Sequence, residues 1–187
     1  YTWPAGDGAS STVLQTSGTG SLSWNTLAGD WQQLGETIVT DDDSVLEVTS
    51  LSERKDLMII VTASTTATGG AEAALEFNNN AGSLYWQRQS INGGADDTVG
   101  AETQMRFRSG NINSRIYLVA YVINETNLPK LVTGNLVYGN AGAAPGRVEA
   151  VGTVDIATTS ITRVQFQFTG GAAIGTSSRI TIYGKKD

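Results

Sequence analysis

The feature that most restricts the fold of this chain is an alternation of apolar and polar side chains with a period of two. In residues 104–108, Met105 and Phe107 alternate with Gln and Arg, and residues 163–169 repeat the pattern. Successive side chains of a strand point to opposite faces of a sheet, so both runs predict half-buried β-strands. The 3.6-residue period of an amphipathic helix is scarce along the chain.

Two further runs, residues 57–61 and 116–123, are apolar on both faces. Such strands sit centrally in a sheet, with the second face covered by another sheet, a loop or a neighbouring subunit. Turn-forming residues recur at short intervals, for example at Asn92-Gly93-Gly94 and Gly170-Gly171. The whole pattern predicts roughly ten short strands in an all-β fold, an antiparallel β-sandwich of the jelly-roll type.

The composition excludes several classes of site and partner. The 187 residues include no Cys and no His, which excludes disulfides, thiolate zinc sites and a Ser-His-Asp triad. The 18 acidic and 12 basic side chains argue against nucleic acid as a partner, because phosphate binding needs surplus cations. No run approaches the roughly 18 apolar residues of a membrane span, so we expect no membrane insertion. The chain begins with Tyr1 rather than Met, so we expect a processed protein or a piece of a longer one.

The first 30 residues differ from the rest, because they are rich in Gly, Ser and Thr and poor in apolar side chains. So few apolar groups cannot offset the ordering entropy of such a segment, which leaves a flexible linker or packing against sister chains. Two tryptophans argue against a linker. We therefore predict an extended oligomerisation segment in residues 1–30, ahead of a β-sandwich domain in residues 31–187. The predicted contacts between chains are Trp3, Val13, Leu14, Leu22 and Trp24.

A resemblance to a known family enters in this segment. The residues that carry it are Tyr1-Thr2-Trp3-Pro4-Ala5-Gly6-Asp7-Gly8 and Val13-Leu14-Gln15-Thr16-Ser17-Gly18-Thr19-Gly20-Ser21-Leu22-Ser23-Trp24. They resemble a motif of bacteriophage tail fibres and other phage appendage proteins, which precedes a C-terminal head domain and implies a trimer. The ending Gly175-Thr176-Ser177-Ser178-Arg179-Ile180-Thr181-Ile182-Tyr183-Gly184 is similar to the close of β-sandwich domains in phage virion proteins. Ile182 stands where that pattern has Leu, and a Lys185-Lys186-Asp187 tail follows.

The resemblance implies a non-enzymatic virion protein, a distal tail-fibre or appendage domain that attaches to the host-cell surface. Its expected partners are two further copies of the chain, other virion proteins and a host-surface glycan, with no cofactor and no metal. Three weak sites on one trimer would bind together with raised avidity. Two alternatives stay open. One is a capsid decoration or head-fibre structural protein. The other is a polysaccharide depolymerase, although the chain lacks the internal repeats of a long β-helix.

The best local cluster for binding a sugar is Tyr85, Trp86 and Arg88, with Gln87 between them. An aromatic face can stack on the C–H groups of a pyranose while nearby polar groups bind its hydroxyls. Because Tyr85 and Trp86 are adjacent on a predicted strand, they point to opposite faces. The alternative is that one of them belongs to the core and the other to a subunit contact.

Three other motifs suggest chemistry but favour plainer interpretations. Residues 41–43 are three aspartates that we interpret as a solvated acidic turn, because the spacing of a Ca²⁺-binding EF-hand is missing. Asp96 and Asp97 are adjacent, so their carboxylates tend to point apart and make a poor acid–base pair. Ser52 and Lys55 match the spacing of a serine acyl-enzyme, but Lys55 introduces an apolar strand, so we expect a charged loop.

Overall fold

The computed structural model of the chain describes residues 2–6, 12–16, 18–26, 30–65, 71–80, 82–112, 115–139 and 144–185. The chain divides into two compact units, Tyr1–Gln32 and Gln33–Asp187. Among the described residues, the only helical element is a single 3₁₀ turn, η1 (Thr169–Gly171). These residues include no helix that could span a membrane. The strands are β1 (Thr12–Thr16), β2 (Leu22–Thr26), β3 (Trp31–Ile38), β4 (Val45–Val48), β5 (Asp56–Ser64), β6 (Ala71–Phe77), β7 (Tyr85–Ile91), β8 (Asp97–Glu102), β9 (Met105–Ile112), β10 (Arg115–Ile123), β11 (Lys130–Gly139), β12 (Gly146–Val154), β13 (Val164–Phe168) and β14 (Arg179–Lys185).

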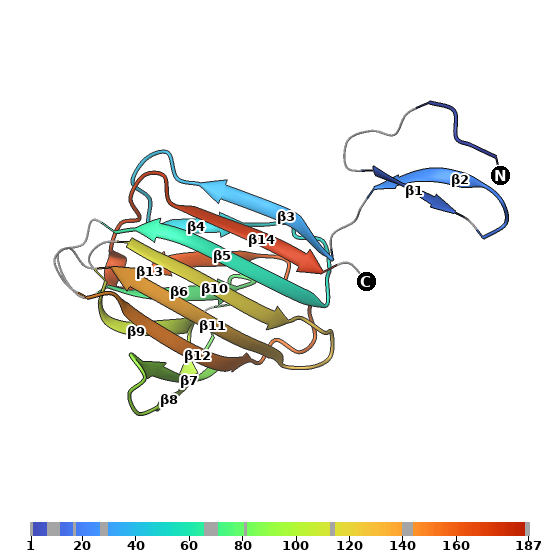
Figure 1. Cartoon of the computed structure of the whole chain (residues 1–187). Helices are drawn as coiled ribbons and strands as arrows, with labels where there is room; N and C mark the ends of the chain where they lie inside the picture. The colour runs from blue at the N-terminus through green and yellow to red at the C-terminus, as the bar shows by residue number, and fades with distance from the viewer. Residues whose placement is uncertain are drawn as a thin grey trace. The chain divides into compact units, whose positions relative to one another are not determined.

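The second unit is a β-sandwich of two unequal sheets, drawn one in front of the other in Figure 1. The large sheet has the order β3-β14-β5-β10-β11-β12-β7-β8, and the small sheet has the order β4-β13-β6-β9. The chain crosses between the sheets so that β3, β14, β5 and β10 face β4, β13, β6 and β9, which is the arrangement of an eight-stranded jelly roll. The predicted fold class is therefore confirmed.

The remaining four strands of this unit extend the large sheet beyond the jelly roll. The pair β7–β8 is inserted between β6 and β9, and the pair β11–β12 is inserted between β10 and β13. The two insertions meet in the large sheet, where β12 pairs antiparallel with β7. The structure thus has more strands than the roughly ten that the sequence predicts, and the extension carries the candidate site.

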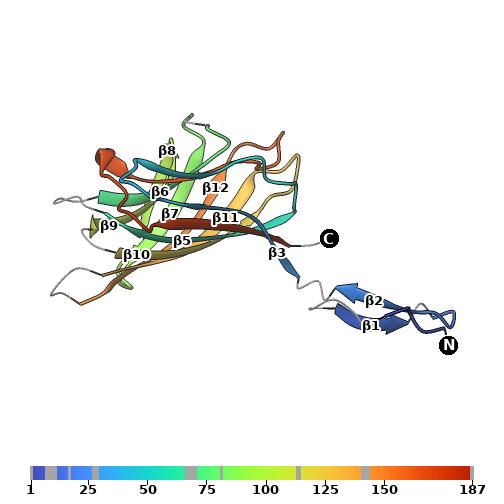
Figure 2. The ribbon, with the colours of Figure 1, turned by 90° about the horizontal axis from the view of Figure 1, so that it is seen from above.

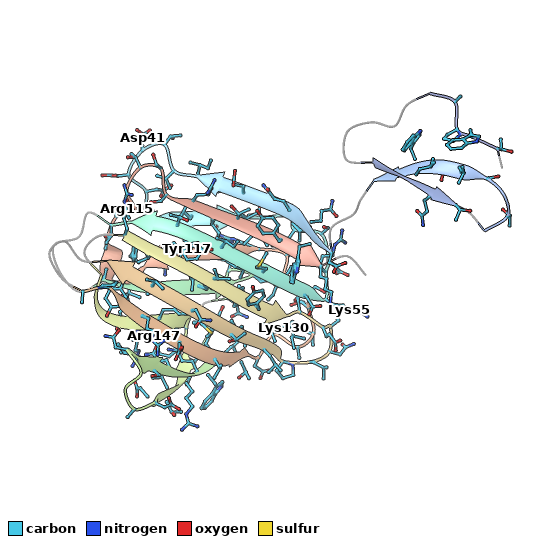
Figure 3. All side chains as sticks on the ribbon, viewed as in Figure 1. Asp41, Lys55, Arg115, Tyr117, Lys130 and Arg147 are labelled. Atoms are coloured by element: carbon cyan, nitrogen blue, oxygen red, sulfur yellow. The ribbon has the colours of Figure 1, made fainter. Side chains whose placement is uncertain are left out.

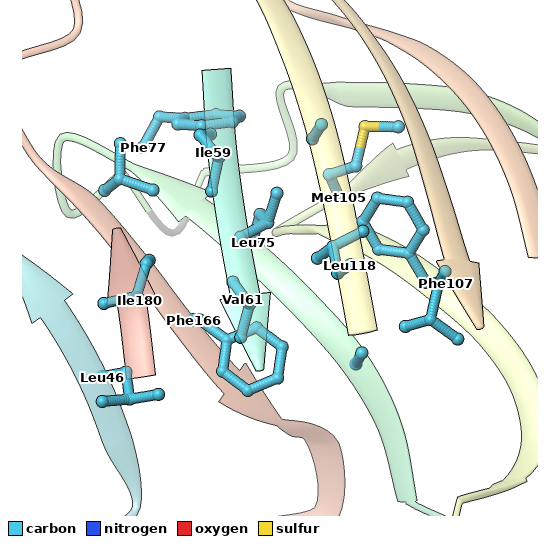
Figure 4. Packing of buried hydrophobic residues seen from close by; sticks show 14 of the residues in the cluster. Leu46, Ile59, Val61, Leu75, Phe77, Met105, Phe107, Leu118, Phe166 and Ile180 are labelled. Carbon is cyan, nitrogen blue, oxygen red and sulfur yellow. The ribbon is translucent and has the colours of Figure 1, made fainter. Parts of the chain in front are cut away.

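The core lies between the two sheets, whose strands Figure 2 shows from above. The two runs that are apolar on both faces form β5 and β10, which are neighbours in the middle of the large sheet, as predicted. Figure 4 shows Ile59, Val61 and Leu118 pointing toward Leu75 and Phe166 of the small sheet. All five side chains are fully buried, and burial of each stabilises the fold by about 1.5–3 kcal/mol.

A side-chain contact ties the extension to the small sheet. Gln87 and Gln89 on β7 are buried, and their side-chain amides hydrogen-bond to the backbone of β9 at Arg106 and Arg108. Strand β9 is the last strand of the small sheet, so these amides occupy the side on which its next neighbour would lie. This contact fixes the position of β7, whose other face belongs to the candidate site.

Candidate functional site

The outer face of the large sheet carries an unusual group of exposed apolar side chains. These side chains, which we call the apolar patch, are between 46% and 53% exposed: Tyr117, Tyr121, Ile123, Leu131, Val137 and Val151. They lie on β10, β11 and β12, where Tyr117 is opposite Val137 and Ile123 is opposite Leu131. Figure 3 shows Tyr117 on this face, with Arg115 and Arg147 toward one end of the strands.

The outer face of the small sheet is different in character. There Arg163 forms an ion pair with Glu47, and the two side chains are 30% and 31% exposed. A face of this kind suits water, whereas an exposed apolar patch marks a surface that contacts something else. We predicted that another sheet, a loop or a neighbouring subunit covers this face. No sheet or loop of the described residues covers the apolar patch, so the prediction of a neighbouring subunit is the one that remains.

A polar groove lies beside the apolar patch, where β11, β12 and β7 run together. Its volume is about 260 Å³, and its polar lining side chains are Arg88, Ser90, Asp96, Thr133, Asn135 and Glu149. The register places them in rows across the sheet, because Asn135 is opposite Glu149 and Glu149 is opposite Ser90. Directly opposed side chains in neighbouring strands lie close enough to contact one ligand together.

The charges around the polar groove balance. Arg88 contacts Asp96, with 2.9 Å between Nε and Oδ2, and Arg147 contacts Glu149, with 3.7 Å between Nη1 and Oε1. The four side chains are 48–62% exposed, so both pairs are of the surface type and contribute little to stability. They instead present two carboxylates and two guanidinium groups to a ligand.

Trp86 lies on the same face of β7 as Arg88, two residues before it. The pairing of β7 with β8 shifts register between Tyr85 and Gln87, which brings Gly100 under the Trp86 ring. A Cβ atom at Gly100 would lie 2.2 Å from Cε3 and Cζ3 of Trp86, so only glycine allows the ring this close to the backbone. Trp86 is 56% exposed, so the ring rests on β8 and keeps much of its surface open to solvent.

Tyr85 requires a correction, because we predicted it as a ligand-binding residue together with Trp86 and Arg88. Its side chain is 1% exposed and lies in the core, where its ring stacks on Phe77 with 6.3 Å between centroids. The backbone N–H of Phe77 donates a hydrogen bond to the Tyr85 hydroxyl oxygen at 2.9 Å. Burial raises the pKa of Tyr85 to about 12. Tyr85 therefore cannot reach a ligand on the outer face, and Gln87 likewise points inward.

The N-terminal unit holds the residues that we predicted as contacts between chains. Strands β1 and β2 pair antiparallel, which places Leu14 opposite Trp24 and Leu22 on the same face, opposite Thr16. Trp3 is 71% exposed and Trp24 is 39% exposed, and among residues 2–6, 14–16 and 18–24 none is buried. The side chain of Val13 lies outside the described residues. The hairpin thus gathers apolar groups without enclosing them in a core.

The plainer interpretations of the other motifs agree with the geometry. The Asp43 carboxylate accepts hydrogen bonds from the backbone of Ser44 and Val45, as in an acidic turn, and the described residues contain no cluster suited to a metal. The carboxylates of Asp96 and Asp97 contact different partners, Arg88 and Arg108. Residues 52–55 form a segment without helix directly before β5.

Comparison of the chain with protein families, with curated proteins and with solved structures finds no match in any of the three. The assignment of function therefore depends on the geometry of the two units and on the motif of the opening residues.

Proposed function

We propose that this chain is the distal domain of a phage tail fibre or similar virion appendage, which attaches to the host-cell surface as a homotrimer without enzymatic activity. The observation that carries the proposal is a hairpin on which Trp24 is exposed and Leu14 and Leu22 are only half-buried, on a chain whose second unit has a core of its own. The resemblance of residues 1–24 to the phage appendage motif is the basis for proposing that the chain belongs to a phage particle and that three copies associate.

The physical argument for the trimer starts from the size of the hairpin. An isolated two-stranded hairpin is marginally stable in water at best, because it cannot bury enough apolar surface to offset its ordering entropy. Leu14, Leu22 and Trp24 share one face of this hairpin, and association of three copies would bury that face. The jelly-roll unit has its own core and needs no partner to fold.

Attachment as a trimer also suits the shallow polar groove. One groove of about 260 Å³ offers few contacts, so each copy binds weakly. Three copies on one rigid support raise the effective concentration of the second and third sites, so overall avidity far exceeds the affinity of one site.

The experiment for this proposal measures oligomeric mass and cell binding of the full chain. We expect a trimer by light scattering, and a shift to monomer when Leu14→Ser and Trp24→Ser are combined. Gln15→Ala, on the opposite face of the hairpin, is the matched control and should remain trimeric. A monomeric wild type at micromolar concentration, or a wild type that fails to bind any cell of a bacterial panel, would overturn the proposal.

A second candidate function is capsid decoration, which the apolar patch favours because a protein partner would bury it. In that case the chain would bind assembled capsids and leave intact bacterial cells unbound. Co-sedimentation of the purified chain with capsids and, separately, with cells distinguishes the two candidates.

A further inference from the structure

We propose that a second copy of the chain covers the apolar patch, in a contact between jelly-roll units that is separate from the hairpin. The inference deepens the proposed homotrimer and rests on it for the number of copies. The contact is centred on β10, so the polar groove lies at its margin. Three properties of the surface identify the partner: its area, its residue types and the charges at its margins.

The apolar surface is large enough for a specific contact. Beyond the patch, Met58, Ile60 and Val119 are partly exposed and continue the surface onto β5, where Ile60 is opposite Val119. Because the six patch side chains are each about half exposed, they leave roughly 500 Å² of apolar surface open, near the upper limit for a typical monomer. Burial of this area on each of two copies removes about 1,000 Å² in total from water, which is the lower limit for a specific interface.

The residue types of this surface are those of a contact between proteins. Tyr117 and Tyr121 share one face of β10, and tyrosine is enriched at interfaces because it buries a large area while ordering only two side-chain torsions. Beyond Asp56 and Arg115, which begin β5 and β10, the outward side chains of β5, β10 and β11 are all uncharged. Charged residues are likewise depleted at the centre of protein interfaces.

The charges at the margins of the patch fit a copy of the same surface. Each margin holds two ion pairs, which are Lys185–Asp56 and Arg179–Glu36 toward β14, and Arg88–Asp96 and Arg147–Glu149 toward β7. These pairs give each margin two cations and two carboxylates. A partner with an excess of one charge would meet repulsion from half of these groups, whereas a copy of the chain brings both signs to each margin.

Tethering makes a contact of this size sufficient. An interface at the lower limit of area binds weakly between free molecules. When the hairpins hold three copies together, the effective concentration of a neighbouring jelly-roll unit reaches about the millimolar range, so a weak contact is still occupied. The two contacts therefore support each other, and loss of either one weakens the trimer.

The test measures association of the full chain by light scattering over a concentration series. We expect Tyr121→Glu and Leu131→Lys each to weaken association about tenfold or more, because each places an unpaired charge in a buried apolar contact. The two new charges have opposite signs, so a similar loss in both excludes simple repulsion between chains of net charge −6. Gln167→Glu, on the outer face of the small sheet, is the matched control and should associate like wild type.

A labelling experiment locates the contact even if a charged variant perturbs the fold. The chain has no cysteine, so Thr62→Cys, opposite Tyr117 on β5, introduces a unique thiol beside the patch. Its reaction with a maleimide should be several times slower in the associated chain than in the monomer obtained by dilution. Ser83→Cys, at an exposed position just before β7, is the control and should react equally fast in both states.

Three outcomes would overturn the inference. One is association that is unchanged in both charge variants, and another is equal reactivity of the Thr62→Cys thiol in the associated and the diluted chain. The third is protection of that thiol only after assembled capsids are added, because the patch would then be the surface that binds the capsid.

The failure of this contact is distinguishable from the failure of the proposed function. If both charge variants remain trimers and bind bacterial cells like wild type, the patch is not a contact between copies and the attachment function stands. If wild type buries the patch between copies but binds no bacterial cell, the contact stands and the attachment function fails.

Discussion

The side-chain amide of Gln87 makes two hydrogen bonds with the backbone of Arg106. Its Nε2 donates to the Arg106 carbonyl oxygen at 2.9 Å, and its Oε1 accepts from the Arg106 N–H at 2.8 Å. A backbone amide of a neighbouring strand would make the same two bonds, so Gln87 replaces a strand at the edge of the small sheet. The adjacent residues Trp86 and Arg88 face the opposite side, so this contact also positions the candidate site.

We expect Gln87→Leu to lower the free energy of unfolding by about 2–4 kcal/mol, because both backbone groups of Arg106 lose a buried partner. Gln87→Glu should cost at least as much at pH 7, because a buried carboxylate oxygen would then face the Arg106 carbonyl oxygen, which it repels. Urea unfolding of the full chain measures both. Arg88→Ala, at the next position on the exposed face, should change stability by less than about 0.5 kcal/mol. Equal losses in Gln87→Leu and Arg88→Ala would contradict the role assigned to Gln87.

Tyr85 predicts how stability depends on alkaline pH. Burial raises the pKa of its hydroxyl from the ordinary 10.0 to about 12 in the folded chain. Below pH 10 the Tyr85 hydroxyl is protonated in both the folded and the unfolded chain, so its contribution to the free energy of unfolding is fully present. Between pH 10 and 12 the unfolded chain loses the proton first, so stability falls by about 1.4 kcal/mol per pH unit.

Tyr85→Phe removes this dependence. At pH 7 the variant should be less stable by about 1–2 kcal/mol, because the Phe77 N–H loses its acceptor. Above pH 10 the difference between the two proteins should shrink, and urea unfolding at a series of pH values measures it. A difference that stays constant from pH 8 to 11.5 would show that the hydroxyl titrates normally in the fold.

The fold was largely predictable because its strands carry strong patterns. Residues 57–61 and 116–123 are apolar on both faces, and these strands lie in the middle of the large sheet. Strand β7 has no such pattern, since Gln87 and Gln89 stand on its buried face where apolar side chains are usual. The alternation of side chains along a strand shows that Tyr85 and Trp86 point to opposite faces. Because both faces of β7 carry polar residues, the alternation does not show which of the two side chains enters the core.

The polar groove was out of reach of the sequence for a different reason. Asn135, Glu149 and Arg88 lie on three strands, and only the register of β11 with β12 and of β12 with β7 brings them together. The pair β7–β8 precedes β9 in the chain, yet it joins the sheet beyond β12. No local spacing reports that crossover, whereas Trp86 and Arg88 could be placed on one face because they are two residues apart.

Gly134 predicts a coupling between the core and the groove. It lies on β11 between Thr133 and Asn135, and a Cβ atom there would be 2.7 Å from Cε1 of Phe107. Gly134→Ala forces Phe107 to move, so we expect a loss of about 1–3 kcal/mol and weaker binding to bacterial cells through displaced groove side chains. Gly139→Ala, later in the same strand and without any atom within 4 Å of the added methyl group, should leave both unchanged. Urea unfolding and cell binding measure the two effects, and similar behaviour of the two alanine variants would contradict the coupling.

Substitutions in the apolar patch should alter the binding of partners without destabilising the fold. Tyr121 is 46% exposed, while its neighbours Ala120 and Val122 point into the core. We expect Tyr121→Glu to change the free energy of unfolding by less than about 1 kcal/mol, because the new carboxylate remains in water. Association between copies of the variant should weaken, since Tyr121 lies in the proposed contact between jelly-roll units. If the chain decorates capsids through this patch, the same substitution abolishes co-sedimentation with capsids, because burying an unpaired carboxylate in an apolar contact is costly. Capsid binding that is strong in wild type and undiminished in Tyr121→Glu would show that the patch is not the surface used.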